Sequence, residues 1–180
     1  MDQADCRQKL GWTPGKFHVL FPSNTGDPVK RPWLALAAVQ RLAAMGVSAE
    51  LHMLSGVPYQ DVPLWINASD VLLLTSLHEG SPTVVKEALA CKVPVVSVDA
   101  GDVRDRIEGL EGCHIADPEP QDLAVKLFRV WERNRRLDST DAVQALSTRH
   151  IAEQLNDFYC DLLQAGRSAY CPDMAGMEAT

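Results

Sequence analysis

Two glutamates flank a short segment that has the features of a helix start. Glu79 and Glu87 are separated by seven residues, and Ser81 and Pro82 lie between them. Serine is a common N-cap residue and proline fits the first position of a helix, so we expect a helix that is capped by Ser81. Unpaired N–H groups and the helix dipole favour a bound anion, such as phosphate, at such a start.

The two carboxylates fit a ligand that carries hydroxyls as well as phosphates. Glu87 lies one turn after Thr83 and therefore on the same helix face, whereas Glu79 precedes the helix. The N–H groups of Thr83 and Val84 would face phosphate oxygens, and the carboxylates would accept charge-assisted hydrogen bonds from hydroxyls. A sugar nucleotide has this shape. The alternative is that Glu79 is a solvated loop acid and Glu87 a surface helix acid.

The sequence gives little support for metal or thiol chemistry. The five cysteines are odd in number and no two have CxxC spacing, which argues against a zinc site or a disulfide framework. We expect Cys91 and Cys113 to be buried thiols. There is no Asp-x-Asp motif and no dense His/Cys cluster, so we predict no metal site.

Short apolar runs alternate with amphipathic segments along the chain. Alternating strands and helices predict an α/β fold with a doubly wound parallel sheet, in which ligands bind beyond the carboxyl ends of the strands. We therefore expect the site in loops 22–30, 55–59, 76–81 and 99–102. Strands are predicted at 17–21, 48–54, 70–76, 93–98 and 112–116, and helices at 31–45, 62–68 (a short helix or turn), 81–91, 101–108 (with Asp102 as its cap), 120–136 and 148–164.

Length and composition suit one compact domain, alone or with a tail. The 180 residues are 46% hydrophobic, and the net charge of -7 gives no support for binding nucleic acid. No apolar run approaches the roughly 20 residues that span a bilayer, and the N-terminus lacks the apolar middle of a signal peptide. We therefore expect a cytoplasmic protein. Helical periodicity ends after Gln164, which predicts a flexible tail at 166–180.

One long run of sequence resembles a known family. The segment TSLHEGSPTVVKEALACKVPVVS (75–97) resembles the signature of retaining GT-B glycosyltransferases of family GT4, with its E-x7-E spacing at Glu79 and Glu87. The run LFPSNTGDPVKRPWLALAAV resembles the first strand, phosphate loop and helix of the same domain. The resemblance covers about residues 9–163. It implies a Rossmann-like donor-binding domain at 1–165, the C-terminal half of a GT-B fold, in which 1–16 resemble the interdomain linker and the N-terminal acceptor-binding domain is absent.

The resemblance also implies roles for individual residues. Glu79 matches the residue near the hydroxyls of the donor sugar, and Glu87 matches the one that binds the ribose. Lys30 matches the lysine that holds the diphosphate and stabilises the leaving group. The arginine that usually precedes this lysine is missing, and Arg31 follows it instead. The other implied donor contacts are the backbone of Gly80, Ser81, Pro82, Thr83 and Val84, and, towards the base, Val57 and Tyr59.

The implied activity is metal-independent, retaining transfer of a hexose-type sugar in polysaccharide or glycoconjugate biosynthesis. The donor would be a UDP-, GDP- or ADP-sugar, without a further cofactor. The isolated domain would be inactive or nearly so, because the acceptor binds to the N-terminal half, which could also contact the inner membrane peripherally. Two alternatives stay open: a sugar-nucleotide epimerase of GT-B architecture, and a non-catalytic sugar-nucleotide-binding subunit that needs a partner chain. The sequence leaves the base, the sugar, the acceptor and the oligomeric state undetermined.

Overall fold

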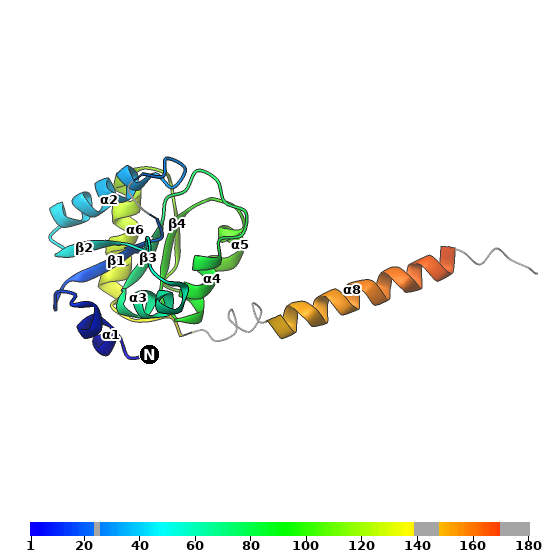
Figure 1. Ribbon diagram of the computed structural model, residues 1–180. Coiled ribbons are helices and arrows are strands. Elements are labelled where there is room, and N and C mark those ends of the chain that lie inside the picture. The colour runs from blue at the N-terminus through cyan, green and yellow to red at the C-terminus, as the bar shows by residue number, and fades with distance from the viewer. Residues whose placement is uncertain (24–25, 139–147, 170–180) are drawn as a thin grey trace, which may run out of the picture. The chain divides into compact units, whose positions relative to one another are not determined.

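The computed structural model describes residues 1–23, 26–138 and 148–169 (Figure 1). The chain divides into two compact units, Met1–Ala142 and Val143–Thr180, whereas the sequence assigned 1–165 to one domain. The first unit contains a five-stranded parallel sheet with the strand order β2-β1-β3-β4-β5. This order confirms the predicted doubly wound, Rossmann-like α/β fold.

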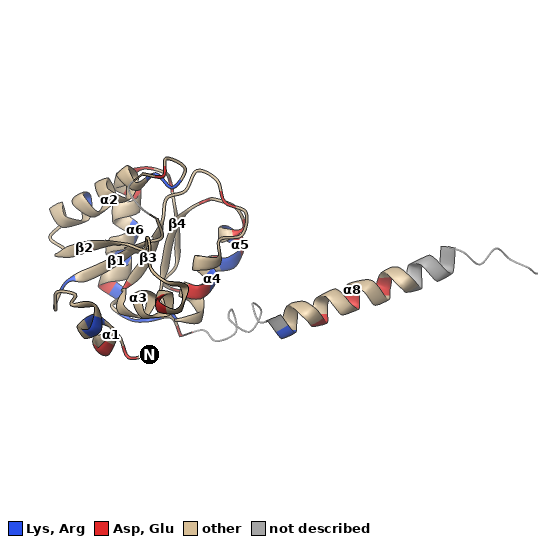
Figure 2. Ribbon diagram, in the orientation of Figure 1, with Lys and Arg blue, Asp and Glu red and all other residues tan. Residues whose placement is uncertain are grey.

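Each strand lies within its predicted range and is one or two residues shorter at one or both ends, except the first, which matches. β3 and β4 lie in the interior of the sheet, and every residue in them is buried. Their sequences, VLLL and VVSV, carry no charged residue, and both strands are tan in Figure 2. Helices on both faces require such apolar strands. The strands are β1 (Phe17–Phe21), β2 (Ala49–Met53), β3 (Val71–Leu74), β4 (Val95–Val98) and β5 (His114–Ala116).

Helices cover both faces of the sheet, as right-handed crossovers require. On one face α2 (Pro32–Ala44) and α6 (Pro120–Arg133) pack together over a core that includes Phe17, Val19 and Phe21 of β1. Side chains alternate along a strand, so His18 and Leu20 point to the opposite face. The remaining helices of this unit are α1 (Gln3–Leu10), η1 (Tyr59–Asp61), α3 (Val62–Ala68), α4 (Thr83–Ala90) and α5 (Val103–Ile107).

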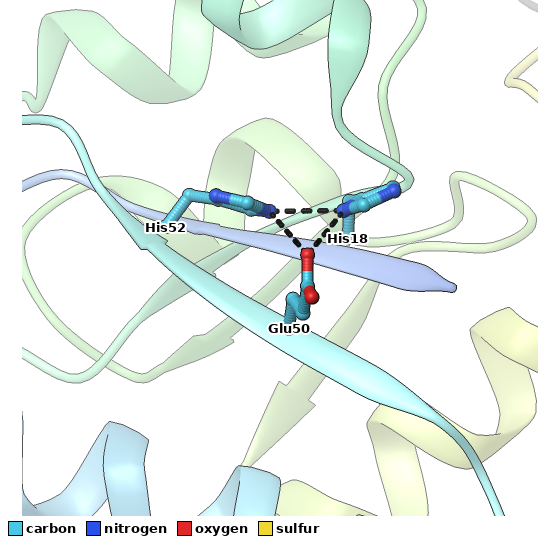
Figure 3. A group of neighbouring side chains, drawn as sticks. All are labelled: His18, Glu50 and His52. Atoms are coloured by element: carbon cyan, nitrogen blue, oxygen red, sulfur yellow. Dashed lines mark hydrogen bonds and ion pairs between the residues drawn. The ribbon is translucent and has the colours of Figure 1, made fainter. Parts of the chain in front are cut away.

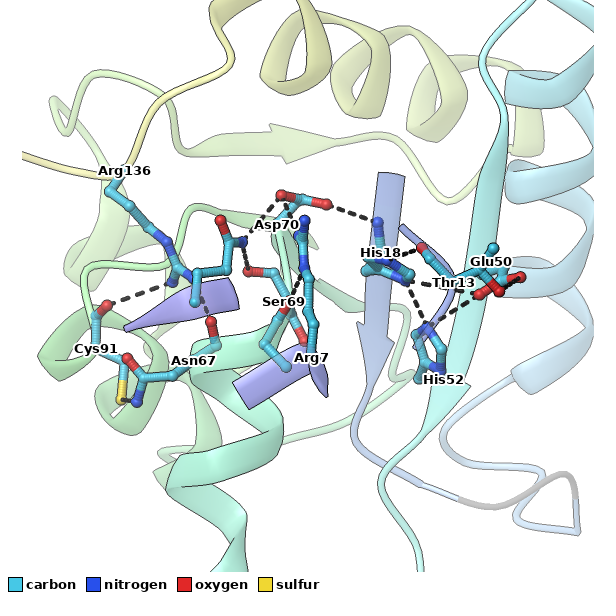
Figure 4. A network of polar contacts seen from close by, with 12 residues as sticks. Arg7, Thr13, His18, Glu50, His52, Asn67, Ser69, Asp70, Cys91 and Arg136 are labelled. Atoms are coloured by element: carbon cyan, nitrogen blue, oxygen red, sulfur yellow. Dashed lines mark hydrogen bonds and ion pairs between the residues drawn. The ribbon is translucent and has the colours of Figure 1, made fainter. Parts of the chain in front are cut away.

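The first residues of the chain fold as a helix that the sequence analysis did not predict. The Asp2 carboxylate caps α1 by accepting from the N–H groups of Ala4 and Asp5. Arg7 then donates to the Ala68 carbonyl at 2.8 Å and forms an ion pair with Asp70 at 2.7 Å (Figure 4). These contacts attach α1 to the end of α3, and the role of 1–16 as an interdomain linker stays a prediction.

The second unit contains one described helix, α8 (Thr148–Ala169). It runs five residues past the predicted end at Gln164, because a single glycine costs a helix only about 1 kcal/mol. Residues 170–180 of the predicted tail lie outside the described residues, so its flexibility stays a prediction. Among the described residues, no helix combines the length and the apolar character needed to cross a membrane.

Candidate functional site

The loops expected to carry the site meet where the direction of the chain across the sheet reverses. β1 lies between β2 and β3 and pairs in register with β3 through Val19–Val71 and Leu20–Leu72. Because both strands are parallel, their carboxyl ends lie at the same edge. The segment that leads to Lys30 leaves β1 there, and the segment that leads to Glu79 leaves β3. Ligands of doubly wound sheets bind at this kind of switch point.

Lys30 and Glu79 form an ion pair at this edge. The Lys30 ammonium lies 2.6 Å from the Glu79 carboxylate, and the two side chains are 27% and 11% exposed. They are 49 positions apart in the sequence, so the topology of the sheet brings them together. The structure therefore joins the two residues that were predicted to be catalytic, on a surface that solvent still reaches.

A set of backbone contacts fixes the loop that carries Lys30. The Thr75 hydroxyl, at the end of β3, donates to the carbonyls of Lys30 at 2.7 Å and Arg31 at 3.1 Å. The Leu77 N–H donates to the Val29 carbonyl at 2.8 Å. The β1 loop is thus held directly against the β3 loop, which limits the positions open to the Lys30 side chain.

Arg31 has a structural task in the same junction. Its guanidinium donates to the carbonyls of Thr75 at 2.5 Å and Ser76 at 3.3 Å, and burial lowers its pKa. Its backbone is left-handed, with φ 52°, directly before Pro32 at the start of α2. The sequence left open whether Arg31 replaces the missing phosphate-binding arginine. The structure shows a side chain committed to the strand end, and we assign it no phosphate contact.

The start of α4 is open, but its cap differs from the prediction. The N-cap residue is Pro82 and no side chain caps the helix, so the prediction that Ser81 caps it was wrong. The Ser81 hydroxyl instead donates to the Asp102 carboxylate at 2.7 Å. The N–H of Val85 donates to the Pro82 carbonyl at 3.2 Å, which is the first hydrogen bond of the helix turn. The N–H groups of Thr83 and Val84 come before it and have no partner within the helix. The helix start that was predicted to bind an anion therefore has no side-chain cap.

The loop after β4 holds the loop after β3 in place. The Asp102 N–H donates to the Gly80 carbonyl at 3.0 Å. Gly101 has φ +60°, and a Cβ there would lie 2.2 Å from the Gly80 oxygen, so only glycine fits. Asp102 occupies the N-cap position of α5 as predicted, but its side chain makes no cap bond.

The Asp102 side chain connects the loop after β3 to α5. Its carboxylate accepts from Ser81 and forms an ion pair with Arg106 at 2.8 Å. Desolvation would raise the pKa of Asp102, but these hydrogen bonds and charges outweigh it and lower the pKa. Asp102 is therefore ionised at neutral pH and positions Ser81. The sequence analysis considered it only as a helix cap.

Glu87 and the predicted base contacts lie in different surroundings. Glu87 is half-buried on α4, and burial raises the pKa of its carboxyl. Val57 is half-buried and Tyr59 is 81% exposed in the segment after β2. Because β2 is the other neighbour of β1, this segment also follows a carboxyl end. Ribose contact by Glu87 and base contact by Val57 and Tyr59 stay predictions.

The structure also assembles a cluster that the sequence analysis missed. His18, Glu50 and His52 bring their ring nitrogens and a carboxylate oxygen within 4.8 Å of one another. His18 and Glu50 are direct partners across β1 and β2, and His52 follows Glu50 by two residues on the same face. The sequence signal for it was the alternation of polar and apolar residues in AELHM, which places Glu50 and His52 on one face of β2. The register with β1, which adds His18, could not be predicted from this pattern.

The two cysteines that were predicted to be buried differ in exposure. Cys113 is buried, and burial raises its pKa to about 11. Cys91 is half-buried and accepts from the Asn67 amide at 3.2 Å. Neither thiol lies among the loops at the carboxyl ends of β1 and β3.

A family model and curated relatives match the chain. The family model for "Glycosyl transferases group 1" matches residues 8–142. The chain is 35% identical over 100 residues to the putative teichuronic acid biosynthesis glycosyltransferase TuaC of Bacillus subtilis, a match that covers 52% of the chain and 26% of TuaC. It is 29% identical over 92 residues to the D-inositol 3-phosphate glycosyltransferase of Streptosporangium roseum, covering 51% and 21%. These matches span about a quarter of the length of the curated relatives.

Solved structures share the fold. Sucrose-phosphate synthase from Thermosynechococcus elongatus has a TM-score of 0.71 at 20% identity, covering 91% of this chain and 50% of that one. The C-terminal domain of the group 1 glycosyl transferase LpcC from Francisella tularensis has a TM-score of 0.63 at 17% identity, covering 83% of this chain and 93% of that one. HepE from Anabaena in complex with UDP-glucose has a TM-score of 0.63 at 21% identity, covering 87% of this chain and 52% of that one.

Proposed function

Because the chain belongs to the glycosyl transferases group 1 family, we propose that it binds the nucleotide-sugar donor of a retaining glycosyltransferase of family GT4. The enzyme transfers a hexose-type sugar from a nucleoside diphosphate to an acceptor. No metal ion takes part at the diphosphate. Lys30 and the start of α4 instead supply the positive charge.

The observation that carries this proposal is the Lys30–Glu79 ion pair beside the uncapped start of α4. One cation and the unpaired N–H groups of Thr83 and Val84 offer two sets of donors to a diphosphate. Glu79 offers an acceptor for sugar hydroxyls in the same place. This combination matches a ligand that is anionic at one part and rich in hydroxyls at the next.

The chemistry follows from where charge develops. As the bond between the sugar and the diphosphate breaks, negative charge grows on the leaving oxygen and the sugar becomes electron-poor. Donors that are already in position stabilise that charge without reorganising. Lys30 and the N–H groups of α4 have this role, while Glu79 orients the sugar and holds Lys30 in place before the donor arrives.

UDP-glucose is the first donor to test, because the HepE structure contains it. GDP- and ADP-sugars follow, since the sequence leaves the base undetermined. In this proposal Glu87 binds the ribose.

The acceptor binds to a second domain outside these 180 residues. The proposal therefore expects the chain alone to bind the donor and to transfer sugar weakly or not at all. It acts in the cytoplasm, and contact with a membrane surface belongs to that second domain.

The test is a calorimetric titration of the chain with UDP-glucose, GDP-mannose and ADP-glucose. We expect saturable binding of at least one of them. A folded sample that takes up none of the three contradicts the proposal.

Replacing Lys30 tests its role directly. Lys30→Met should weaken binding of the preferred sugar nucleotide by about 1.5–3 kcal/mol, the range for hydrogen bonds to charged groups. Binding of the nucleoside alone should change little. Lys126→Met is the matched control, because Lys126 pairs with Asp122 on α6. Equal losses for nucleotide and nucleoside would argue against a diphosphate contact.

A further inference from the structure

Two histidines and a glutamate converge on the β1–β2 pair (Figure 3). The register pairs His18 with Glu50 and Leu20 with His52, so the three polar side chains leave the same face of the sheet. His18 Nδ1 lies 2.9 Å from His52 Nε2. Glu50 Oε2 lies 3.7 Å from the first nitrogen and 3.8 Å from the second. Three potential metal ligands thus face one point.

The hydrogen bonds of His18 fix which nitrogen is available. Its Nε2 lies 3.0 Å from the Thr13 carbonyl oxygen (Figure 4). A carbonyl only accepts, so Nε2 carries the proton and Nδ1 presents its lone pair to His52 and Glu50. Metal-bound histidines typically donate their other N–H to a backbone carbonyl in this way, which fixes the tautomer and the ring.

The other two ligands are also held in orientation. Trp12 stacks on the His52 ring, with centroids 3.6 Å apart and an interplanar angle of 6°. Lys16 lies 2.5 Å from Glu50 Oε1, and the Thr13 hydroxyl donates to the same oxygen at 3.1 Å. Oε2 is therefore the oxygen that faces the histidines. The Lys16 charge opposes a nearby cation, so we expect weaker binding than at a thiolate site.

The spacing suits a tetrahedral ion after a small adjustment. Ligands about 2.0–2.1 Å from Zn²⁺ lie about 3.3–3.4 Å from one another at tetrahedral angles. The two distances to Glu50 are a few tenths of an ångström longer than this, and the distance between the histidines is slightly shorter. In the ion-free protein His52 Nε2–H donates to His18 Nδ1. An ion would replace that hydrogen, with the His52 proton moving to Nδ1.

Burial differs among the three side chains. The cluster is still reachable, since the His52 and Glu50 side chains are 15% and 27% exposed while His18 is fully buried.

We propose that His18 Nδ1, Glu50 Oε2 and His52 Nε2 bind a divalent transition metal of the Zn²⁺ class, with a fourth position open to water. Two imidazoles and one carboxylate are a ligand set that such ions accept. His18 lies near the start of β1, whereas Lys30 and Glu79 follow the carboxyl ends of β1 and β3. The ion would therefore connect β1, β2 and the Thr13 segment without touching the donor. This proposal does not depend on the proposed function.

The test is a calorimetric titration of the full chain with ZnCl₂, in a background of Cys160→Ser and Cys171→Ser to remove thiols that bind zinc adventitiously. We expect one site per chain and a higher melting temperature with zinc, because a ligand that binds only the folded state stabilises it. His52→Gln and Glu50→Gln should each weaken binding by more than the roughly 10- to 100-fold typical of outer-shell changes. His114→Gln, at a half-buried histidine of β5, should leave binding unchanged.

The proposal is overturned if the folded parent binds no zinc, or if binding survives in both ligand variants. Equal losses in His114→Gln and His52→Gln also overturn it. If a variant does not fold, the visible absorption spectrum of Co²⁺ bound to the parent tests the site instead. Strong visible absorption typical of tetrahedral Co²⁺ supports the site, and the weak spectrum of hydrated Co²⁺ contradicts it.

Discussion

At the scale of single residues, the two glutamates that flank the α4 start differ in how their charge is compensated. Glu79 faces the Lys30 ammonium at 2.6 Å. Glu87 is half-buried, and desolvation raises its pKa. A partly desolvated carboxylate lowers the stability of the ligand-free protein, and a ligand hydroxyl that donates to it would offset this loss. Stability and donor binding therefore make opposite demands on Glu87.

Glu87→Gln should separate these demands. The neutral amide avoids the desolvated charge, so the variant should melt at a higher temperature than the wild type at pH 7. Its affinity for the sugar nucleotide should fall by about 1.5–3 kcal/mol, because the charge-assisted hydrogen bonds to the ribose are lost. Thermal unfolding and calorimetry measure the two effects. Glu132→Gln, at an exposed position of α6, is the control and should change neither.

The stabilisation by Glu87→Gln should depend on pH. A folded-state pKa above the ordinary value of 4.5 means that the penalty is absent while Glu87 is protonated. It appears as pH rises above 4.5 and is complete above the folded-state pKa. The difference in unfolding free energy between variant and wild type, measured with urea, should thus grow from pH 4 to pH 7. A constant difference would assign the effect to packing instead of charge.

At the scale of elements, three loops at the carboxyl ends of β1, β3 and β4 support one another. Thr75 fixes the loop of Lys30, and Asp102 fixes Ser81. Gly101 permits the closest approach between two of these loops. The start of α4, where we predict that an anion binds, is thus positioned by contacts with neighbouring loops and has no side-chain cap.

Gly101→Ala should disrupt this arrangement. The new Cβ would lie 2.2 Å from the Gly80 oxygen and 2.9 Å from the Glu79 oxygen, at a φ of +60°. Backbone strain of about 1–2 kcal/mol and overpacking of about 1–3 kcal/mol should together lower the unfolding free energy by about 2–5 kcal/mol. Donor binding should weaken too, because Glu79 and Gly80 must move. Urea unfolding and calorimetry measure both.

Gly109→Ala is the matched control for this substitution. Gly109 also has positive φ, at +79°, but a Cβ there meets nothing within 4 Å. The unfolding free energy of Gly109→Ala should fall only by the backbone strain of about 1–2 kcal/mol, and its affinity for the donor should not change. Equal losses in the two variants would mean that the contact between the loops has no effect.

At the scale of the whole molecule, the sheet and the predicted donor site belong to one unit. The core residues that pack between the sheet and the helices α2 and α6 run from Phe17 to Val130, all within Met1–Ala142. Leu137 is also buried and donates its N–H to the Lys92 carbonyl at 2.9 Å. In α8, by contrast, the apolar side chains of Ile151, Leu155 and Phe158 are exposed.

A fragment of residues 1–142 should therefore fold alone. We expect a cooperative unfolding transition and an affinity for the sugar nucleotide within about threefold of the full chain, because no proposed donor contact is removed. Circular dichroism and calorimetry measure these properties. A shorter fragment, 1–134, lacks Leu137 and should be less stable. A 1–142 fragment that fails to fold would show that the second unit contributes to the stability of the first.

Local patterns in the sequence determined much of this protein. The run VLLL, within the strand predicted at 70–76, is typical of an interior strand, because only strands buried on both faces can be apolar throughout. The helix predicted at 31–45 was found as α2, where Pro32 suits the first turn and Gly46, just beyond the end, has positive φ. The resemblance around Glu79 and Glu87 indicated the family and the helix that would bind a phosphate.

Only the tertiary structure decided which distant residues meet. The pairing of Lys30 with Glu79, the hydrogen bonds of Arg31 and Ser81, and the cluster of His18, Glu50 and His52 all depend on strand order and register. Hydrophobic periodicity shows which residues are buried, but it does not determine which strand lies next to which. Polar groups then bond to whatever partners the sheet places beside them, so their roles could not be read from neighbours in the sequence.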